Sequence, residues 1–121
     1  MEIRRQLIVF DTADLETESA FWARMLGGEV DADVDDGWYT ILVDGKPQMC
    51  FQHAPDHVPP DWPDGAPQQV HLDLYVDDIA TAHAETMANG ARLLQAADTT
   101  AAEGFQVYAD PSGHPFCLCW G

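Results

Sequence analysis

The fold is decided by one stretch of sequence, His71-Leu72-Asp73-Leu74-Tyr75-Val76-Asp77-Asp78-Ile79. Its first six residues alternate between polar and apolar side chains, which is typical of a strand with one buried face. The buried face carries Leu72, Leu74 and Val76, and the other face carries His71, Asp73 and Tyr75. Asp78 has the position of a helix N-cap, because its carboxylate can accept a hydrogen bond from a first-turn N–H. The stretch therefore predicts a strand that leads directly into a helix.

The same arrangement occurs in the first half of the chain. Leu7-Ile8-Val9-Phe10 is followed by Asp14, which precedes Asp78 by 64 residues, and by a helical stretch that ends at Gly27. The second helical stretch ends in the same way at Gly90, since glycine tolerates the left-handed backbone of a helix end. Each half of the chain therefore reads as a strand, an Asp cap and a helix. The matching halves indicate an internal duplication.

Three strand-like segments follow each helix. In the first half they are 29–34, 38–43 and 48–52, and in the second half they are 91–96, 104–109 and 115–120. A proline-rich connector, 54–68, separates the halves. The predicted fold class is α+β, with two tandem βαβββ modules forming a curved mixed sheet around one cleft. The predicted organisation is one domain over 1–121, with module one at 1–53 and module two at 69–121.

Composition excludes several classes of protein. The chain has 121 residues and a formal net charge of -16, with 21 acidic and 5 basic residues, so a basic surface for nucleic acid is excluded. No apolar run reaches the roughly 20 residues of a membrane helix. Three cysteines without a paired spacing indicate reduced thiols. The first residues have no signal-peptide pattern, so we expect a cytoplasmic protein that binds neither nucleic acid nor membrane.

The second face of the predicted sheet is the candidate site. Alternation puts polar, thiol and apolar groups on this face, a mixture that suits a ligand cleft better than a dry core. The residues expected to contact a ligand are Leu7, Trp38, Cys50, Gln52, Trp62, Tyr75 and Cys117. Trp62 is held stiffly by neighbouring prolines and is predicted to line or cover the cleft. Other aromatic residues that are candidates for the wall are Tyr39, Phe105 and Tyr108.

The order of three motifs resembles the vicinal oxygen chelate superfamily, which includes glyoxalase I, bleomycin-resistance proteins and extradiol dioxygenases. The motifs are the helix from Asp14-Leu15 through Phe21-Trp22 to Leu26-Gly27, the strand that begins at His71, and the turn Asp110-Pro111-Ser112-Gly113-His114. The connector further resembles a bacterial glyoxalase-like subgroup. The resemblance implies the duplicated βαβββ fold and, because superfamily members often dimerise, makes a homodimer an open alternative.

The resemblance also defines where a metal would bind. Metal-dependent members use four cleft positions, which correspond here to Leu7, Cys50, His71 and Cys117. Only His71 is a usual ligand, and no carboxylate occupies the set, so we expect no cofactor of the Mg²⁺, Mn²⁺, Ni²⁺ or Fe²⁺ type. The alternative is a divalent metal of the zinc type held by His71, Cys50 and Cys117.

Two functions follow from these residues. The first is binding of a small apolar or aromatic molecule without a metal, as in bleomycin-resistance-like sequestration or sensing. The alternative is a divergent lyase, isomerase or dioxygenase-like enzyme that uses His71, with or without a metal. His71 and Asp73 share a strand face about 7 Å apart at the backbone, so the carboxylate can orient the imidazole as a general base. His71 and Asp73 are therefore the candidate catalytic residues if the protein is an enzyme.

Overall fold

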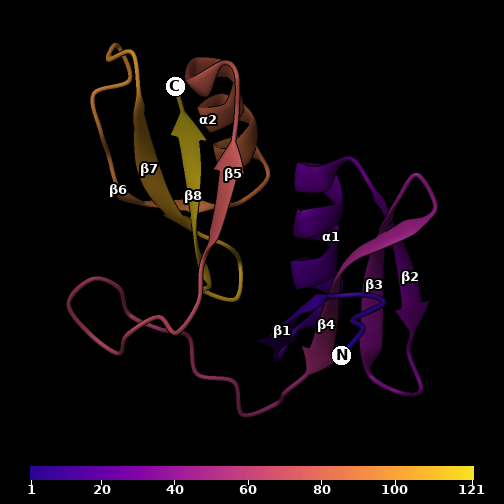
Figure 1. Cartoon of the computed structure of the whole chain (residues 1–121). Coiled ribbons are helices and arrows are strands. Elements are labelled where there is room, and N and C mark those ends of the chain that lie inside the picture. The colour runs from indigo at the N-terminus through magenta and orange to yellow at the C-terminus, as the bar shows by residue number, and fades with distance from the viewer. The chain divides into compact units, whose positions relative to one another are not determined.

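The computed structural model describes all 121 residues, and the chain divides into two compact units, Met1–His57 and Val58–Gly121. Each unit contains one helix and one four-stranded sheet (Figure 1). In both sheets the first strand runs parallel to the last strand of its unit, while the remaining pairs are antiparallel. The predicted α+β fold of two tandem βαβββ modules is confirmed.

The first unit is built from β1 (Ile8–Thr12), α1 (Leu15–Leu26), β2 (Glu29–Asp33), β3 (Trp38–Val43) and β4 (Lys46–His53). The strand order is β1-β4-β3-β2, and α1 packs against β3 and β4. Large apolar side chains between the helix and the sheet are fully buried: Phe21, Trp22, Ile41 and Phe51. Burial of these side chains is the main favourable contribution to the stability of this unit.

Both ends of α1 follow from the sequence. The Asp14 carboxylate accepts a hydrogen bond from the Thr17 backbone N–H at 3.1 Å and one from the Thr17 hydroxyl at 2.7 Å. Gly27 ends the helix with a φ of 65°, a left-handed conformation that residues with a Cβ adopt at a cost. The predicted cap and the predicted end of this helix are therefore confirmed.

The second unit is built from β5 (Leu72–Tyr75), α2 (Ile79–Ala88), β6 (Arg92–Gln95), β7 (Gly104–Ala109) and β8 (Pro115–Trp120). The strand order is β5-β8-β7-β6, and α2 packs against β8. Asp78 caps α2 by accepting a hydrogen bond from the Thr81 N–H at 3.2 Å. The C-cap of the helix is Asn89, one residue before the predicted Gly90, which has a φ of 109°. Neither helix has the length and apolar character that spanning a membrane requires.

The observed strands differ from the predicted ones only at their ends. β4 begins at Lys46, two residues before the predicted start at residue 48, because its pairing with β3 continues to the hairpin turn. β6 is limited to Arg92–Gln95, and its pairing with β7 is irregular between Leu93 and Gln95. Leu7 and His71 each directly precede the first strand of their unit.

Strand register gives independent support for the duplication. Val9 of β1 is paired with Cys50 of β4, and Asp73 of β5 is paired with Cys117 of β8. Leu7 precedes Val9 by two residues, just as His71 precedes Asp73. The four positions that the sequence comparison equates are therefore equivalent within the two modules.

Candidate functional site

α2 packs on one face of the second sheet, and the other face carries a groove; this second face is called the open face below. Residues that are paired across neighbouring strands share a face, and the open face carries two rows of such residues. The first row is Asp73, Cys117 and Val107, and the second row is Tyr75, Cys119 and Phe105. All six side chains therefore lie on three adjacent strands, β5, β8 and β7, whose positions are fixed by backbone hydrogen bonds.

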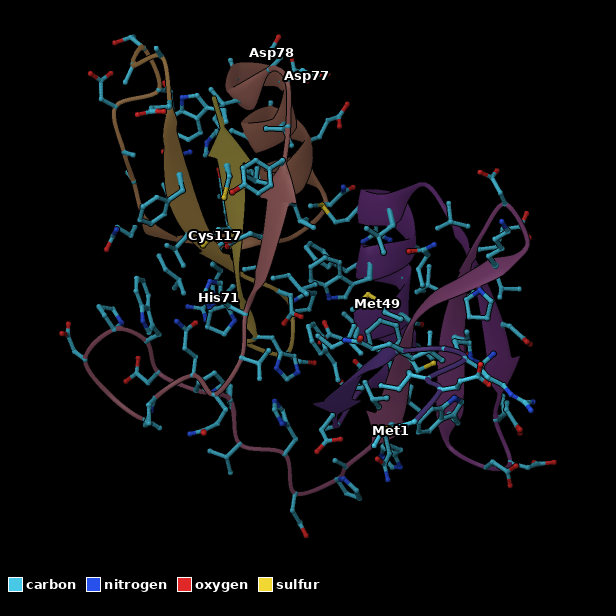
Figure 2. All side chains as sticks on the ribbon, viewed as in Figure 1. Met1, Met49, His71, Asp77, Asp78 and Cys117 are labelled. Atoms are coloured by element: carbon cyan, nitrogen blue, oxygen red, sulfur yellow. The ribbon has the colours of Figure 1, made fainter.

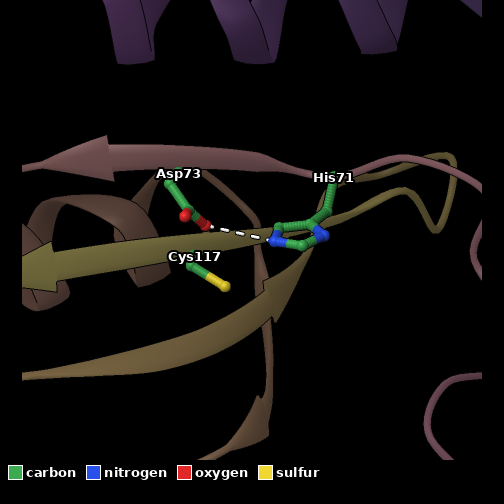
Figure 3. Close-up of side chains that lie close together, drawn as sticks. All are labelled: His71, Asp73 and Cys117. Atoms are coloured by element: carbon green, nitrogen blue, oxygen red, sulfur yellow. Dashed lines mark ion pairs between the residues drawn. The ribbon is translucent and has the colours of Figure 1, made fainter.

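His71 and Asp73 form an ion pair at one end of this face. Nε2 of His71 lies 3.2 Å from Oδ1 of Asp73, and the two side chains are 43% and 46% exposed. Figure 3 shows the thiol of Cys117 beside this pair, and one ligand atom from each of the three residues lies within 4.8 Å of the others. Cys117 is only 7% exposed. The site thus combines an accessible imidazole and an accessible carboxylate with one buried sulfur.

The two thiols on this face are held in the protonated form. Burial raises the pKa of Cys117 to about 12, and the negative charge of Asp73, a hydrogen bond with Asp73 and the neighbouring Cys119 act in the same direction. Burial and the charge of Asp73 also raise the pKa of Cys119. A thiol is a nucleophile only as the thiolate, so neither cysteine is activated for nucleophilic catalysis.

A groove of about 650 Å³ lies over the open face of the second sheet. It is lined by His71, Asp73, Tyr75, Glu103, Gly104, Phe105, Cys117, Cys119, Trp120 and Gly121. Tyr75 is 76% exposed and Phe105 is 51% exposed, although both carry large aromatic rings. Exposed aromatic rings that line a groove on a rigid sheet are typical of ligand sites.

Trp62 of the connector belongs to the same region. Its ring packs, together with Leu94, against the cluster of Val107, Cys117 and Cys119 on the open face. Figure 2 shows His71 and Cys117 on the second unit, close to the connector chain. The connector therefore covers part of the open face of this sheet.

Nearly the whole amino-acid sequence matches one protein family. The glyoxalase-like domain matches residues 7–119, nearly the full chain. The chain belongs to the glyoxalase-like domain family. This finding agrees with the predicted membership of the vicinal oxygen chelate superfamily.

Solved structures agree with the glyoxalase-like fold at low sequence identity. The fosfomycin resistance protein FosX from Listeria monocytogenes is 14% identical with a TM-score of 0.73, over 100% of this chain and 93% of that chain. FosX from Mesorhizobium loti is 12% identical with a TM-score of 0.71, over 100% and 94%. An integron cassette protein from the Halifax Harbour sewage outfall is 19% identical with a TM-score of 0.67, over 98% and 100%. Comparison with curated proteins gave no match.

The residues of this glyoxalase-like domain do not fit the metal that the superfamily resemblance implies. Of the four ligand positions, Leu7 offers no donor atom, and Cys50 and Cys117 offer sulfur. Octahedral sites for hard cations are built from several oxygens. The first module has no carboxylate at the position equivalent to Asp73, because the residue paired with Cys50 there is Val9. The donor set therefore does not suit Mg²⁺, Mn²⁺ or Fe²⁺.

The predicted site residues divide between the two units. Leu7, Trp38, Cys50 and Gln52 belong to the first unit, in which Trp38 and Gln52 are paired across β3 and β4. Cys50 is buried there, with its Sγ 3.6 Å from the Thr40 hydroxyl. The structure brings together the predicted residues of the second unit, which are His71, Asp73, Tyr75, Trp62 and Cys117.

Two of the aromatic candidates for the wall are wrong. Tyr39 and Tyr108 are buried against the helices of their units, because they lie on the helix-facing side of β3 and β7. Sequence reasoning missed Glu103, Gly104 and Trp120, which also line the groove. The Trp120 ring packs so close to Gly104 that a Cβ there would lie 2.7 Å from it, and both residues line the groove. Such a contact between strand ends leaves no periodic signal in the sequence.

Proposed function

We propose that this protein binds a small, partly aromatic molecule in the groove on the open face of its second sheet. The observation that carries this proposal is the row Tyr75, Cys119 and Phe105 on three adjacent strands. Neighbouring strands lie about 4.8 Å apart, so the backbones at Tyr75 and Phe105 are about 10 Å apart. Stacked aromatic rings have centroids 4.5–7 Å apart, so one flat ring fits between the two, above the short Cys119 side chain.

The polar groups at one end of the groove can orient the bound molecule. His71 and Asp73 are accessible at this end and can donate and accept hydrogen bonds, while the two thiols beneath stay neutral. The remaining charged residue in the wall is Glu103. Two carboxylates and one imidazole disfavour an anionic group and favour a ligand that carries hydrogen-bond donors. Sequestration or sensing of such a molecule needs binding alone.

A thermal-shift screen with uncharged and cationic aromatic compounds tests the proposal. A compound at 100 times its Kd adds about 2.7 kcal/mol of stability, which is easily measured. We expect Tyr75→Ala and Phe105→Ala to remove most of the shift. Met87→Ala is the matched control, because Met87 is a large exposed apolar residue on α2, outside the groove. A shift that survives both groove substitutions would place the ligand elsewhere.

The ion pair of His71 and Asp73 favours a second function, a proton-transfer enzyme of the lyase or isomerase type. Nε2 of His71 faces Oδ1 of Asp73 at 3.2 Å, so Asp73 favours the neutral tautomer that carries its proton on Nε2, in which Nδ1 is a proton acceptor. Nδ1 can take a proton from a carbon acid of the substrate and return it at a second position, as an isomerase requires. Conversion of a bound ligand, lost in His71→Gln with binding retained, would favour this function over sequestration.

The proposal also covers domain organisation, location and oligomeric state. We propose that the two units act as one cytoplasmic domain, and that the chain forms a homodimer by analogy with its superfamily. Limited proteolysis between the units and sedimentation of the intact chain test these two points. Cleavage with independent melting of the halves would contradict the single domain.

A further inference from the structure

A second, smaller pocket, the side pocket, adjoins the groove at the end of β5 and has a volume of about 390 Å³. The residues that line it are Tyr75, Val76, Asp77, Ala102, Trp120 and Gly121. Tyr75, Trp120 and Gly121 also line the groove, so the groove and the side pocket share one wall. A molecule bound in the groove can therefore extend into the side pocket while it stays on the second unit.

The side pocket combines one carboxylate with aromatic rings. Asp77 is its single charged residue, is exposed, and makes no hydrogen bond or ion pair through its carboxylate within the protein. No lysine or arginine lines the groove or the side pocket. Tyrosine and tryptophan rings attract organic cations, and a carboxylate beside them adds a charge-assisted hydrogen bond. The chemistry of the side pocket therefore suits an ammonium group.

The backbone on both sides of Asp77 is held by hydrogen bonds. The Val76 N–H donates to the Cys119 carbonyl oxygen at 2.9 Å, so the pairing of β5 with β8 continues past the end of the strand. Asp78 caps α2 through the Thr81 N–H at 3.2 Å. Asp77 lies between this paired strand end and this capped helix, so its position relative to the shared wall is fixed.

The shared wall offers a fixed aromatic surface. Trp120 is 8% exposed, and its indole N–H donates to the Ala101 carbonyl oxygen at 3.0 Å. This hydrogen bond holds the ring in one orientation. Tyr75 is 76% exposed and lines both the groove and the side pocket. Both of these spaces therefore present aromatic surface to a single ligand.

Strand geometry sets the distance between the two ends of such a ligand. Asp77 follows Tyr75 by two residues, which is about 7 Å along a strand, and a ring above Cys119 lies one strand to the side, about 4.8 Å away. These two displacements put the ring about 8 Å from the Asp77 backbone. A nitrogen about 2.8 Å from the carboxylate then lies about 5–8 Å from the ring centre. A chain of two to four carbons spans this distance.

We propose that the ligand is an arylalkylamine, a molecule with an aromatic ring and a protonated amine joined by a short carbon chain. The ring lies in the groove between Tyr75 and Phe105, and the ammonium group binds the Asp77 carboxylate in the side pocket. This inference rests on the proposed small-molecule function and specifies its ligand class. Alkylamines are protonated at neutral pH, as lysine is, and a protein with a net charge of -16 attracts them.

Calorimetric titration of the full-length chain with two probes tests the ammonium site. The probes are 3-phenylpropylamine and 3-phenylpropanol, which have the same ring and chain but differ in charge. We expect the amine to bind at least about fivefold more tightly than the alcohol, because it gains an ion pair and a cation–π contact. High salt is expected to reduce this advantage, since screening weakens an accessible ion pair. This second measurement needs no variant.

Asp77→Asn is expected to lower the affinity of the amine to that of the alcohol. Asp77 is exposed and the capping residue is Asp78, so urea unfolding of the variant should match that of the parent. Glu85→Gln is the matched control, because it removes one negative charge from an exposed residue of α2 outside the groove and the side pocket. The advantage of the amine is expected to persist in this control.

Tyr75→Ala separates this inference from the proposed function, because both probes need the ring site and both should bind more weakly in this variant. Equal affinities of the amine and the alcohol, both reduced in Tyr75→Ala, would overturn the ammonium site and support the proposed function. An advantage of the amine that persists in Asp77→Asn would also overturn the site. Failure of both probes to bind the parent would count against the ammonium site and the proposed function together.

Discussion

The hydroxyl of Tyr108 lies 2.8 Å from Nδ1 of His83 and so connects β7 to α2. The same hydroxyl accepts a hydrogen bond from the side-chain amide of Gln106 at 2.9 Å, which leaves its own proton for Nδ1. The Gln106 carbonyl oxygen in turn accepts from the Ala97 N–H at 3.0 Å. This chain of polar groups, which is buried at Gln106 and Tyr108, connects the helix to the sheet whose other face carries the groove.

Tyr108→Phe is expected to destabilise the protein by about 1–3 kcal/mol, because the buried Gln106 amide and the half-buried Nδ1 of His83 each lose a hydrogen-bond partner. The measurement is unfolding in urea. Tyr75→Phe is the control, because Tyr75 is largely exposed and should change stability by less than about 0.5 kcal/mol. Equal effects of the two substitutions would contradict the role of the buried chain.

Acid should weaken both helix caps. Hydrogen bonds from Thr17 hold the pKa of Asp14 below 3.8, and hydrogen bonds from Thr81 do the same for Asp78. A pKa lowered by folding gives stability that is present above the unfolded value and is lost as pH falls through the folded value. The stability from these caps is therefore intact at neutral pH and decreases below pH 3.8.

Substitution by asparagine removes the titratable carboxylate and keeps the capping hydrogen bond, because asparagine caps helices about as well as aspartate. The double variant Asp14→Asn, Asp78→Asn is expected to unfold in urea with a smaller pH dependence than the parent below pH 3.8. An unchanged dependence would show that other carboxylates determine acid unfolding. Asp14→Ala should cost about 1 kcal/mol at neutral pH.

Cys117 should be slow to alkylate. Its pKa is raised from 9.0 to about 12, so its thiolate fraction at pH 8 is about a thousandfold smaller than that of an ordinary thiol. The variant Cys50→Ser, Cys119→Ser leaves Cys117 as the single thiol for rate measurements with iodoacetamide. We expect the rate to keep rising above pH 9, while the same chain in urea reaches a plateau. A plateau near pH 9 in the folded protein would contradict the raised pKa.

Hard cations should be absent from the purified protein. The four superfamily positions supply one imidazole, two thiols and a leucine, so the oxygens that Mg²⁺, Mn²⁺ and Fe²⁺ require are missing. Elemental analysis of protein prepared without a chelator is expected to show no stoichiometric Ni²⁺, Mn²⁺, Fe²⁺ or Mg²⁺. Near one equivalent of any of these, lost on His71→Ala, would contradict this prediction.

Features with local causes could be predicted from the sequence. Asp14 and Gly27 define the ends of α1 through bonds to residues a few positions away, and alternation alone puts His71 and Asp73 on one face. Features that depend on tertiary contacts could not. At the irregular pairing of β6, Leu94 packs against the Cys117 cluster, and Trp120 packs on Gly104 in the groove wall. Neither contact leaves a pattern in the order of residues.

The parallel pairing of β5 with β8 has a consequence for synthesis on the ribosome. β8 lies between β5 and β7 in the sheet, yet it is made last, after α2, β6 and β7 have emerged. Until then β5 has no neighbour, and its apolar residues Leu72 and Leu74 stay uncovered on one side. Closing such distant contacts is slow compared with forming hairpins. The nascent module therefore passes through a state in which β5 and one edge of β7 are unpaired, and in this state aggregation and chaperone binding compete with insertion of β8.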